Sequence, residues 1–289
     1  MSNFTTITYE TRGKVAIVTL NRPKVQNAIS RLMTRELDLA FTIACQDDVV
    51  KCIYLRSEGN NFSSGHDLGS DQQLNDVERP QEMDPRPRGT YLKWYNNDVE
   101  MALKWRRLRK PIVCGLKGYC IYHGTVVSSF ADICIGAEDL KYMPSLVEAN
   151  LFPWVTNLQI QKIKEILFTQ RFVLAKECQD LGIINRIVKA NELDEECMKL
   201  CHLISKSDAY HLWMMKKMIN SAQDVAGLET HVRNSLDTWT SYRRDALDPL
   251  VIPKSQKTKD HGGDSKKLAP VASSLKGEAW RLSQLGSKL

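Results

Sequence analysis

Residues 110–139, KPIVCGLKGYCIYHGTVVSSFADICIGAED, contain the pattern that decides the fold class. Two short apolar stretches within it, PIVCG (111–115) and ADICIGA (131–137), have the length and composition of buried strands. Between them, a glycine-containing turn leads into an expected helix over 124–131. The segment predicts two strands joined by a helix.

The chain before this segment continues the alternation of strands and helices. Residues 5–20 alternate apolar and polar side chains around a glycine turn and predict a hairpin. An apolar stripe at helical spacing predicts a helix over 30–46, with Ser30 as its N-cap. A buried strand is expected at 52–56 and one long helix at 90–108. This alternation is typical of an α/β domain.

The chain after this segment has a mainly helical pattern. The expected helices lie at 156–168, 173–180, 191–206, 208–223 and 228–246. No glycine-rich phosphate-binding or dinucleotide-binding motif occurs in the sequence. The pattern therefore predicts three regions: a core over 1–190, a C-terminal helical region over 191–250 and a tail over 251–289.

The composition excludes several classes of protein. The chain has 289 residues, of which 43% are hydrophobic and 26% charged, so it has enough apolar surface for a sizeable core. No apolar run approaches the ~20 residues of a membrane span. The first 20 residues lack the features of a signal peptide. We expect a globular protein that does not cross a membrane.

Eight cysteines lie mostly within apolar stretches, which favours reduced, buried thiols in an intracellular protein. Cys197, Cys201 and His202 have the spacing of metal ligands, but no second matching pair accompanies them. We therefore expect structural cysteines and no metal site.

The positive charge is concentrated in the tail. Residues 251–289 carry a net charge of +5 out of +6 for the whole chain. Such a tail can contact nucleic acid, anionic lipid or phosphate groups, or can be a solvated extension. It lacks the interleaved aromatic residues of a nucleic-acid-binding surface, so we do not expect a nucleic-acid partner.

Four segments together resemble the crotonase (enoyl-CoA hydratase/isomerase) superfamily. They are VAIVTLNRPKVQNAIS (15–30), NFSSGHDL (61–68), the segment 110–139 and ILFTQRFVLAKECQDLGIINRIV (166–188). The resemblance implies a crotonase-type spiral of β-β-α units followed by a C-terminal helical trimerisation region. It also implies a homotrimer or a dimer of trimers, and an acyl-CoA substrate.

Members of this family stabilise a thioester enolate in an oxyanion hole made of two backbone N–H groups. The resemblance assigns these donors to His66, in SSGHD, and His123, in IYHGT. Two preorganised amide donors lower an oxyanion barrier by ~2.7–4 kcal/mol each. A helix that begins beside His123 adds a partial positive charge.

The same two histidines are candidates for acid–base catalysis, because imidazole titrates near neutrality. In the alternative, both side chains turn outward and only their amides act. Family hydratases use two glutamates to activate water, and the resemblance places Val126 and Leu146 at those positions. Glu148 is a candidate for a displaced catalytic base or a surface carboxylate.

The resemblance also assigns residues to the ligand. Coenzyme A enters as part of the substrate rather than as a tightly bound cofactor. Its expected contacts are Lys24, Val25, Ala28, His66, Asp67 and Leu68. The expected acyl pocket comprises Tyr122, Val126, Leu146 and Trp154. For Asp67, we favour acceptance of backbone hydrogen bonds within its own loop.

Two functions remain open at this level. The first is an acyl-CoA-transforming enzyme, a lyase or isomerase, with a non-standard acid/base. The second is an inactive acyl-CoA-binding or scaffolding homologue. The sequence ends in Ser287-Lys288-Leu289, a tripeptide that the peroxisomal import receptor recognises. We expect a peroxisomal location and that receptor as a partner in a eukaryotic cell, and a cytoplasmic location otherwise.

Overall fold

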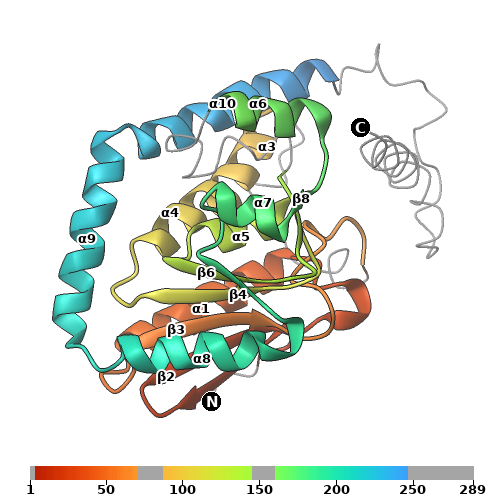
Figure 1. Cartoon of the computed structure of the whole chain (residues 1–289). Helices are drawn as coiled ribbons and strands as arrows, with labels where there is room; N and C mark the ends of the chain where they lie inside the picture. The colour runs from red at the N-terminus through yellow and green to blue at the C-terminus, as the bar shows by residue number, and fades with distance from the viewer. Residues whose placement is uncertain (1–3, 71–86, 145–159, 247–289) are drawn as a thin grey trace.

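A computed structural model describes residues 4–70, 87–144 and 160–246 (Figure 1). A six-stranded sheet has the order β1-β2-β3-β4-β6-β9. Only the β1–β2 pair is antiparallel, and the other pairs are parallel. The strands are β1 (Ile7–Arg12), β2 (Val15–Leu20), β3 (Cys52–Ser57), β4 (Ile112–Leu116), β6 (Ile133–Ala137) and β9 (Arg186–Val188).

A smaller sheet of three short strands lies beside the large one. Strand β7 (Lys141–Met143) is its centre, parallel to β5 (Tyr119–Ile121) and antiparallel to β8 (Val173–Leu174). These three strands and β9 are not predicted by the sequence, because runs of two or three residues carry no measurable periodicity. The expected helix at 173–180 accordingly begins only at Ala175.

Helices cover both faces of the large sheet (Figure 1). Helix α8 (Leu193–Ile204) packs its Leu193, Cys197 and Cys201 against one face. Helices α1 (Arg31–Gln46), α4 (Glu100–Arg106), α5 (His123–Ser129) and α7 (Ala175–Asp180) cover the other. All six residues of β2 are buried, as expected of a strand covered on both faces. The α/β fold is confirmed.

The remaining helices enclose the second face and one side of the molecule (Figure 1). They are α3 (Pro87–Trp94), α6 (Ile160–Thr169), α9 (Ala209–Val225) and α10 (Leu228–Ala246). Two 3₁₀ turns, η1 (Pro23–Val25) and η5 (Ala190–Glu192), and one π-helical turn, η2 (Tyr95–Val99), are the other described helical elements. Of the helix expected at 156–168, residues 156–159 lie outside the described residues. None of the described helices is long and apolar enough to cross a membrane.

The hairpin, helix α1 and its N-cap follow the sequence prediction. Strand β1 pairs with β2 over its full length. The hydroxyl of Ser30 accepts a hydrogen bond from the backbone N–H of Met33 at 3.2 Å, as an N-cap does. The helix then buries the predicted apolar stripe, including Met33, Leu37, Ala40 and Ala44.

The single helix expected over 90–108 is wrong in one respect. A π-helical turn, η2 (Tyr95–Val99), separates α3 from α4, and the N–H of Glu100 donates to the carbonyl of Tyr95, five residues earlier. A π turn adds a residue and rotates the following side chains. Trp94 therefore packs in one apolar cluster and Trp105 in another, rather than on a common stripe.

The cysteines are free thiols within apolar clusters, as expected. All eight are free, and all except the half-buried Cys45 are buried. Burial raises the pKa of the Cys197 thiol to about 12, so this thiol is protonated at neutral pH. Cys201 lies in the same apolar cluster, while His202 is exposed on α8.

Candidate active site

Two loops that come together at one end of the large sheet carry His66 and His123. The loop after β3 bonds to the β5 segment, since Ser63 N–H donates to Tyr119 O at 3.0 Å and Ile121 N–H donates to Ser63 O at 3.1 Å. Ile29 N–H donates to Gly65 O at 2.8 Å. These backbone bonds set the loop that carries His66 beside the N-terminus of α5.

Glycines allow this close approach. A Cβ on Gly65 would lie 2.9 Å from the Cβ of Tyr122, and a Cβ on Gly124 would lie 2.9 Å from the Cβ of Ser63. Both distances are too short for real carbon contacts. Tyr122, the N-cap of α5, has φ of 49°, an unusual value for a non-glycine residue outside a regular turn. The backbone before His123 is therefore held in a strained conformation.

The two imidazoles stack on each other. Their ring centroids are 4.1 Å apart and their planes differ by 17°. His123 is 3% exposed, and the side chain of His66 is 25% exposed. The ring of Trp94 meets that of His66 edge-on at 4.9 Å. The alternative in which both side chains turn outward is wrong for His123, because its ring is buried beneath that of His66.

Asp98 contacts both histidines of this pair, and no sequence motif marks it. Its Oδ1 lies 3.0 Å from Nδ1 of His123 and 3.8 Å from Nε2 of His66. The first distance is that of a hydrogen bond, although the two groups are not aligned as one. Asp98 is 5% exposed and belongs to the π turn η2. A π turn is a frequent feature of functional sites, but no sequence periodicity reveals one.

Among the described residues, His66, Asp98 and His123 also form a group of side chains of the types that bind metal ions. Their potential ligand atoms all lie within 4.8 Å of one another. An ion must lie near the plane of each imidazole that binds it, about 2.0–2.1 Å from the nitrogen. Stacked rings direct their in-plane lone pairs side by side rather than toward one point. This arrangement suits proton transfer better than joint metal binding.

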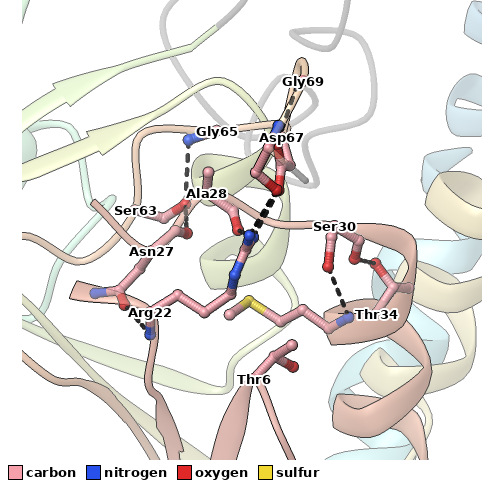
Figure 2. A network of polar contacts seen from close by, with 12 residues as sticks. Thr6, Arg22, Asn27, Ala28, Ser30, Thr34, Ser63, Gly65, Asp67 and Gly69 are labelled. Atoms are coloured by element: carbon pink, nitrogen blue, oxygen red, sulfur yellow. Dashed lines mark hydrogen bonds and ion pairs between the residues drawn. The ribbon is translucent and has the colours of Figure 1, made fainter. Parts of the chain in front are cut away.

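A buried ion pair supports the loop of His66 from below (Figure 2). Nη1 of Arg22 donates to Oδ2 of Asp67 at 2.7 Å and to the carbonyl of Ala28 at 2.6 Å, and Nη2 donates to the Ser70 hydroxyl at 2.8 Å. Oδ1 of Asp67 accepts from the backbone N–H groups of Gly69 and Ser70. The interpretation of Asp67 as a loop-holding residue is confirmed.

The electrostatics of Asp67 agree with this role. Burial raises the pKa of the carboxyl, but the hydrogen bonds from Ser70, Arg22 and Gly69 outweigh it and leave the pKa below its ordinary value. Arg22 falls within the motif that suggested a coenzyme A contact, yet its guanidinium is directed into the protein. The sequence carried no signal for this pairing.

Of the other residues predicted to contact coenzyme A, three are exposed and one is buried. Lys24 is exposed, Val25 is 39% exposed and Leu68 is 82% exposed, whereas Ala28 is buried. These positions leave the first three accessible to a ligand.

Of the predicted acyl-pocket residues, Tyr122 and Val126 are described. Tyr122 is half-buried at the start of α5. Val126 is 2% exposed and packs in an apolar cluster with Val99 and with Leu228 of α10. Leu146, Glu148 and Trp154 lie outside the described residues.

The fold, with two loops that meet at the N-terminus of α5, is that of the crotonase class. Residues 10–246 match the family model described as enoyl-CoA hydratase/isomerase. The chain belongs to this family, and it is an enzyme of the hydratase/isomerase type.

Solved structures and curated proteins that resemble this chain support the same family assignment. A crystal structure of a "probable enoyl-CoA hydratase" from Mycobacterium thermoresistibile superposes with a TM-score of 0.74 at 30% identity, covering 84% of this chain and 98% of that one. Enoyl-CoA hydratase EchA19 of Mycobacterium tuberculosis is 28% identical over 206 residues, 68% of this chain and 73% of its own. The trans-2-decenoyl-[acyl-carrier-protein] isomerase of Streptococcus mutans is 24% identical and covers 81% of this chain and 90% of its own.

Proposed function

We propose that this enzyme moves a proton on the acyl chain of an enoyl-CoA, as a double-bond isomerase. The observation that carries the proposal is the stacking of His66 and His123, whose centroids are 4.1 Å apart. By resemblance, the backbone N–H groups of these residues are the oxyanion donors. The same two residues thus supply both the hole for the enolate and the imidazoles that can carry the proton.

The reaction needs only one proton carrier. An imidazole nitrogen removes a proton from Cα of a 3-enoyl thioester, and the electron pair moves onto the thioester oxygen as a dienolate. The two amides hold that negative charge in a site from which water is largely excluded. The same proton returns to Cγ, the electron pair returns from the oxygen, and the 2-enoyl thioester results with no net gain or loss of atoms.

Hydration is less well supported by the residues at hand. Water addition by the family's route needs two carboxylates, and the resemblance places Val126 at one of those positions. Val126 is packed among apolar side chains, which neither bind water nor transfer a proton. The name of the Streptococcus mutans relative shows that isomerisation occurs among similar chains.

The direct test is turnover of two coenzyme A thioesters by the purified enzyme. We expect conversion of a 3-enoyl-CoA to the conjugated 2-enoyl-CoA, measured by absorbance, to exceed hydration of the 2-enoyl-CoA. His123→Gln lowers kcat by ~10²–10⁴-fold, the usual contribution of a general acid–base group. His202→Gln, at an exposed histidine on α8, is the matched control and leaves kcat unchanged. Faster hydration, or binding without turnover as in a scaffolding homologue, contradicts the proposal.

For the coenzyme A moiety, we propose a position over η1 and the loop 66–68. The exposure of Lys24, Val25 and Leu68 supports this, and Lys24 supplies a cation for the phosphates. Asp67 contributes through its backbone, because its carboxylate is bonded within the protein. Lys24→Ala raises KM for the thioester and leaves kcat unchanged. An unchanged KM contradicts this placement.

We also propose that the helical region assembles the chain into a homotrimer or a dimer of trimers. Helix α9 exposes five large apolar side chains, and a group of exposed apolar residues of this size marks a protein–protein contact. They are Tyr210, Met215, Met218, Ile219 and Val225. Sedimentation velocity tests this, since the Met218→Lys variant dissociates if α9 is the contact. A monomeric native protein contradicts it.

A further inference from the structure

We propose that Asp98 is the positioning residue of the histidine pair. Its carboxylate holds His123 in the tautomer with the proton on Nδ1, so that Nε2 is the basic nitrogen. This inference rests on the proposed function for its catalytic consequence, but the tautomer itself can be tested without any activity.

Burial is the first argument. Asp98 is 5% exposed, and the neighbouring Val99 is fully buried in an apolar cluster with Leu103 and Leu228. A buried carboxylate without a partner is strongly unfavourable. The ion-pair partners that the structure gives Asp98, among the described residues, are His66 and His123. The carboxylate is therefore retained in an apolar setting through its contact with the imidazoles.

The unequal distances give the second argument. Oδ1 of Asp98 lies 3.0 Å from Nδ1 of His123 but 3.8 Å from Nε2 of His66. If Nδ1 carried its lone pair, that lone pair would face the carboxylate oxygen across 3.0 Å and repel it. A proton on Nδ1 turns the same contact into a charge-assisted attraction. The nitrogen nearest a fixed acceptor thus determines the tautomer of the ring.

Nδ1 of His123 and Oδ1 of Asp98 are close enough for a hydrogen bond and lack only its alignment. The Nδ1–Oδ1 distance already suits a hydrogen bond, but the N–H is not aligned with the oxygen. Catalytic hydrogen bonds in structures without ligand are frequently misaligned and tighten when substrate binds. The stacked ring of His66 limits how far the His123 ring can tilt out of its own plane.

The backbone provides the third argument. Asp98 lies in the π turn η2, in which Glu100 N–H bonds to Tyr95 O. The added residue rotates Asp98 relative to α3, so that Asp98 and Val99 are the buried residues of the turn. Such a turn weakens a helix and is retained where it positions a functional side chain. Here it brings the carboxylate to His123.

The first experiment reads the tautomer in the full-length native enzyme with ¹⁵N-labelled histidine. We expect the nitrogen shifts of His123 to show Nδ1–H, with a downfield, exchange-protected proton. His123→Gln assigns this signal. Asp98→Asn abolishes the protected proton, while Glu100→Gln, a carboxylate variant two residues away whose native partner is Arg233, leaves it intact. An Nε2–H tautomer in the native enzyme, or a signal that survives Asp98→Asn, overturns the proposal.

The second experiment measures kinetics on the acyl-CoA that the native enzyme converts. Asp98→Asn lowers kcat by ~10²-fold or more at unchanged KM, and Asp98→Glu restores part of it. A merely structural role changes kcat and KM together, or gives no rescue, and either result overturns the catalytic part. If the native enzyme converts no thioester, the proposed function fails while the tautomer result stands by itself.

A metal measurement completes the test. We expect the purified enzyme to retain no stoichiometric zinc, and added Zn²⁺ to bind Asp98→Asn as weakly as the native enzyme. Stoichiometric zinc that is lost in both His66→Ala and Asp98→Asn would make the cluster a metal site and overturn the proposal. Should Asp98→Asn fail to fold, Asp98→Glu and the native tautomer measurement still decide it.

Discussion

Arg22 and Asp67, 45 positions apart, form an ion pair at 2.7 Å with side chains only 10% and 4% exposed. The pair connects the end of β2 with the loop that carries His66. Because the loop has little regular structure of its own, this contact and the backbone bonds around Gly65 hold it in place. The position of one catalytic candidate therefore depends on a residue that directly follows the first hairpin.

Removing Arg22 should destabilise the protein strongly. Arg22→Gln leaves a buried carboxylate without its ion-pair partner, which costs about 3–5 kcal/mol. The matched control is Arg12→Gln, which breaks an exposed pair with Glu10 and costs about 0–1 kcal/mol. Urea unfolding of the two variants gives the comparison. Equal midpoints for Arg22→Gln and Arg12→Gln would contradict a structural role for the buried pair.

The contribution of Asp67 to the free energy of unfolding should decrease at acidic pH. The folded state lowers the pKa of this carboxyl, so folding favours its ionised form. Its stabilisation is complete above the unfolded pKa of about 3.9 and is lost as the pH falls through the lower folded pKa. The difference in unfolding free energy between native enzyme and Asp67→Asn should therefore narrow below about pH 4. A difference that stays constant down to acid unfolding would be inconsistent with this.

An added methyl group at Gly124 should separate the two loops. The Cβ of Gly124→Ala meets the Cβ of Ser63 at 2.9 Å and its carbonyl at 3.2 Å, and we expect a cost of about 1–3 kcal/mol with loss of activity. Gly182→Ala is the control, because nothing lies within 4 Å of its Cβ although φ is +73°. It should cost about 1 kcal/mol through backbone strain alone. Full activity of Gly124→Ala would show that the loops need no close contact.

The thiols should be inert in the native protein. Burial raises the pKa of Cys197 and Cys178, so the reactive thiolate is scarce at pH 8. A thiol reagent should titrate at most one cysteine, Cys45, before unfolding and all eight in denaturant. Rapid native labelling of several thiols would mean that the apolar clusters open readily.

Local features of the structure were predictable because they depend on neighbouring residues. Periodic or apolar stretches of at least five residues predicted the β1–β2 hairpin, helix α1 and strands β4 and β6. The N-cap at Ser30 was predictable from its residue type directly before the helix. Four short strands and the π turn lacked such a pattern. The resemblance of four segments identified the family, which the match over residues 10–246 confirmed.

The sequence by itself determined the fold class, the family and the two histidines, because these follow from local periodicity and from motifs in a fixed order. Only the tertiary structure decided that Asp98 meets His123 and that Arg22 meets Asp67. Asp98 stands in YNNDVE, a polar stretch without a motif, and a one-residue insertion in the helix turns it inward. Contacts between side chains distant in the chain depend on loop paths and on helix rotation, and neither of these leaves a periodic trace in the sequence.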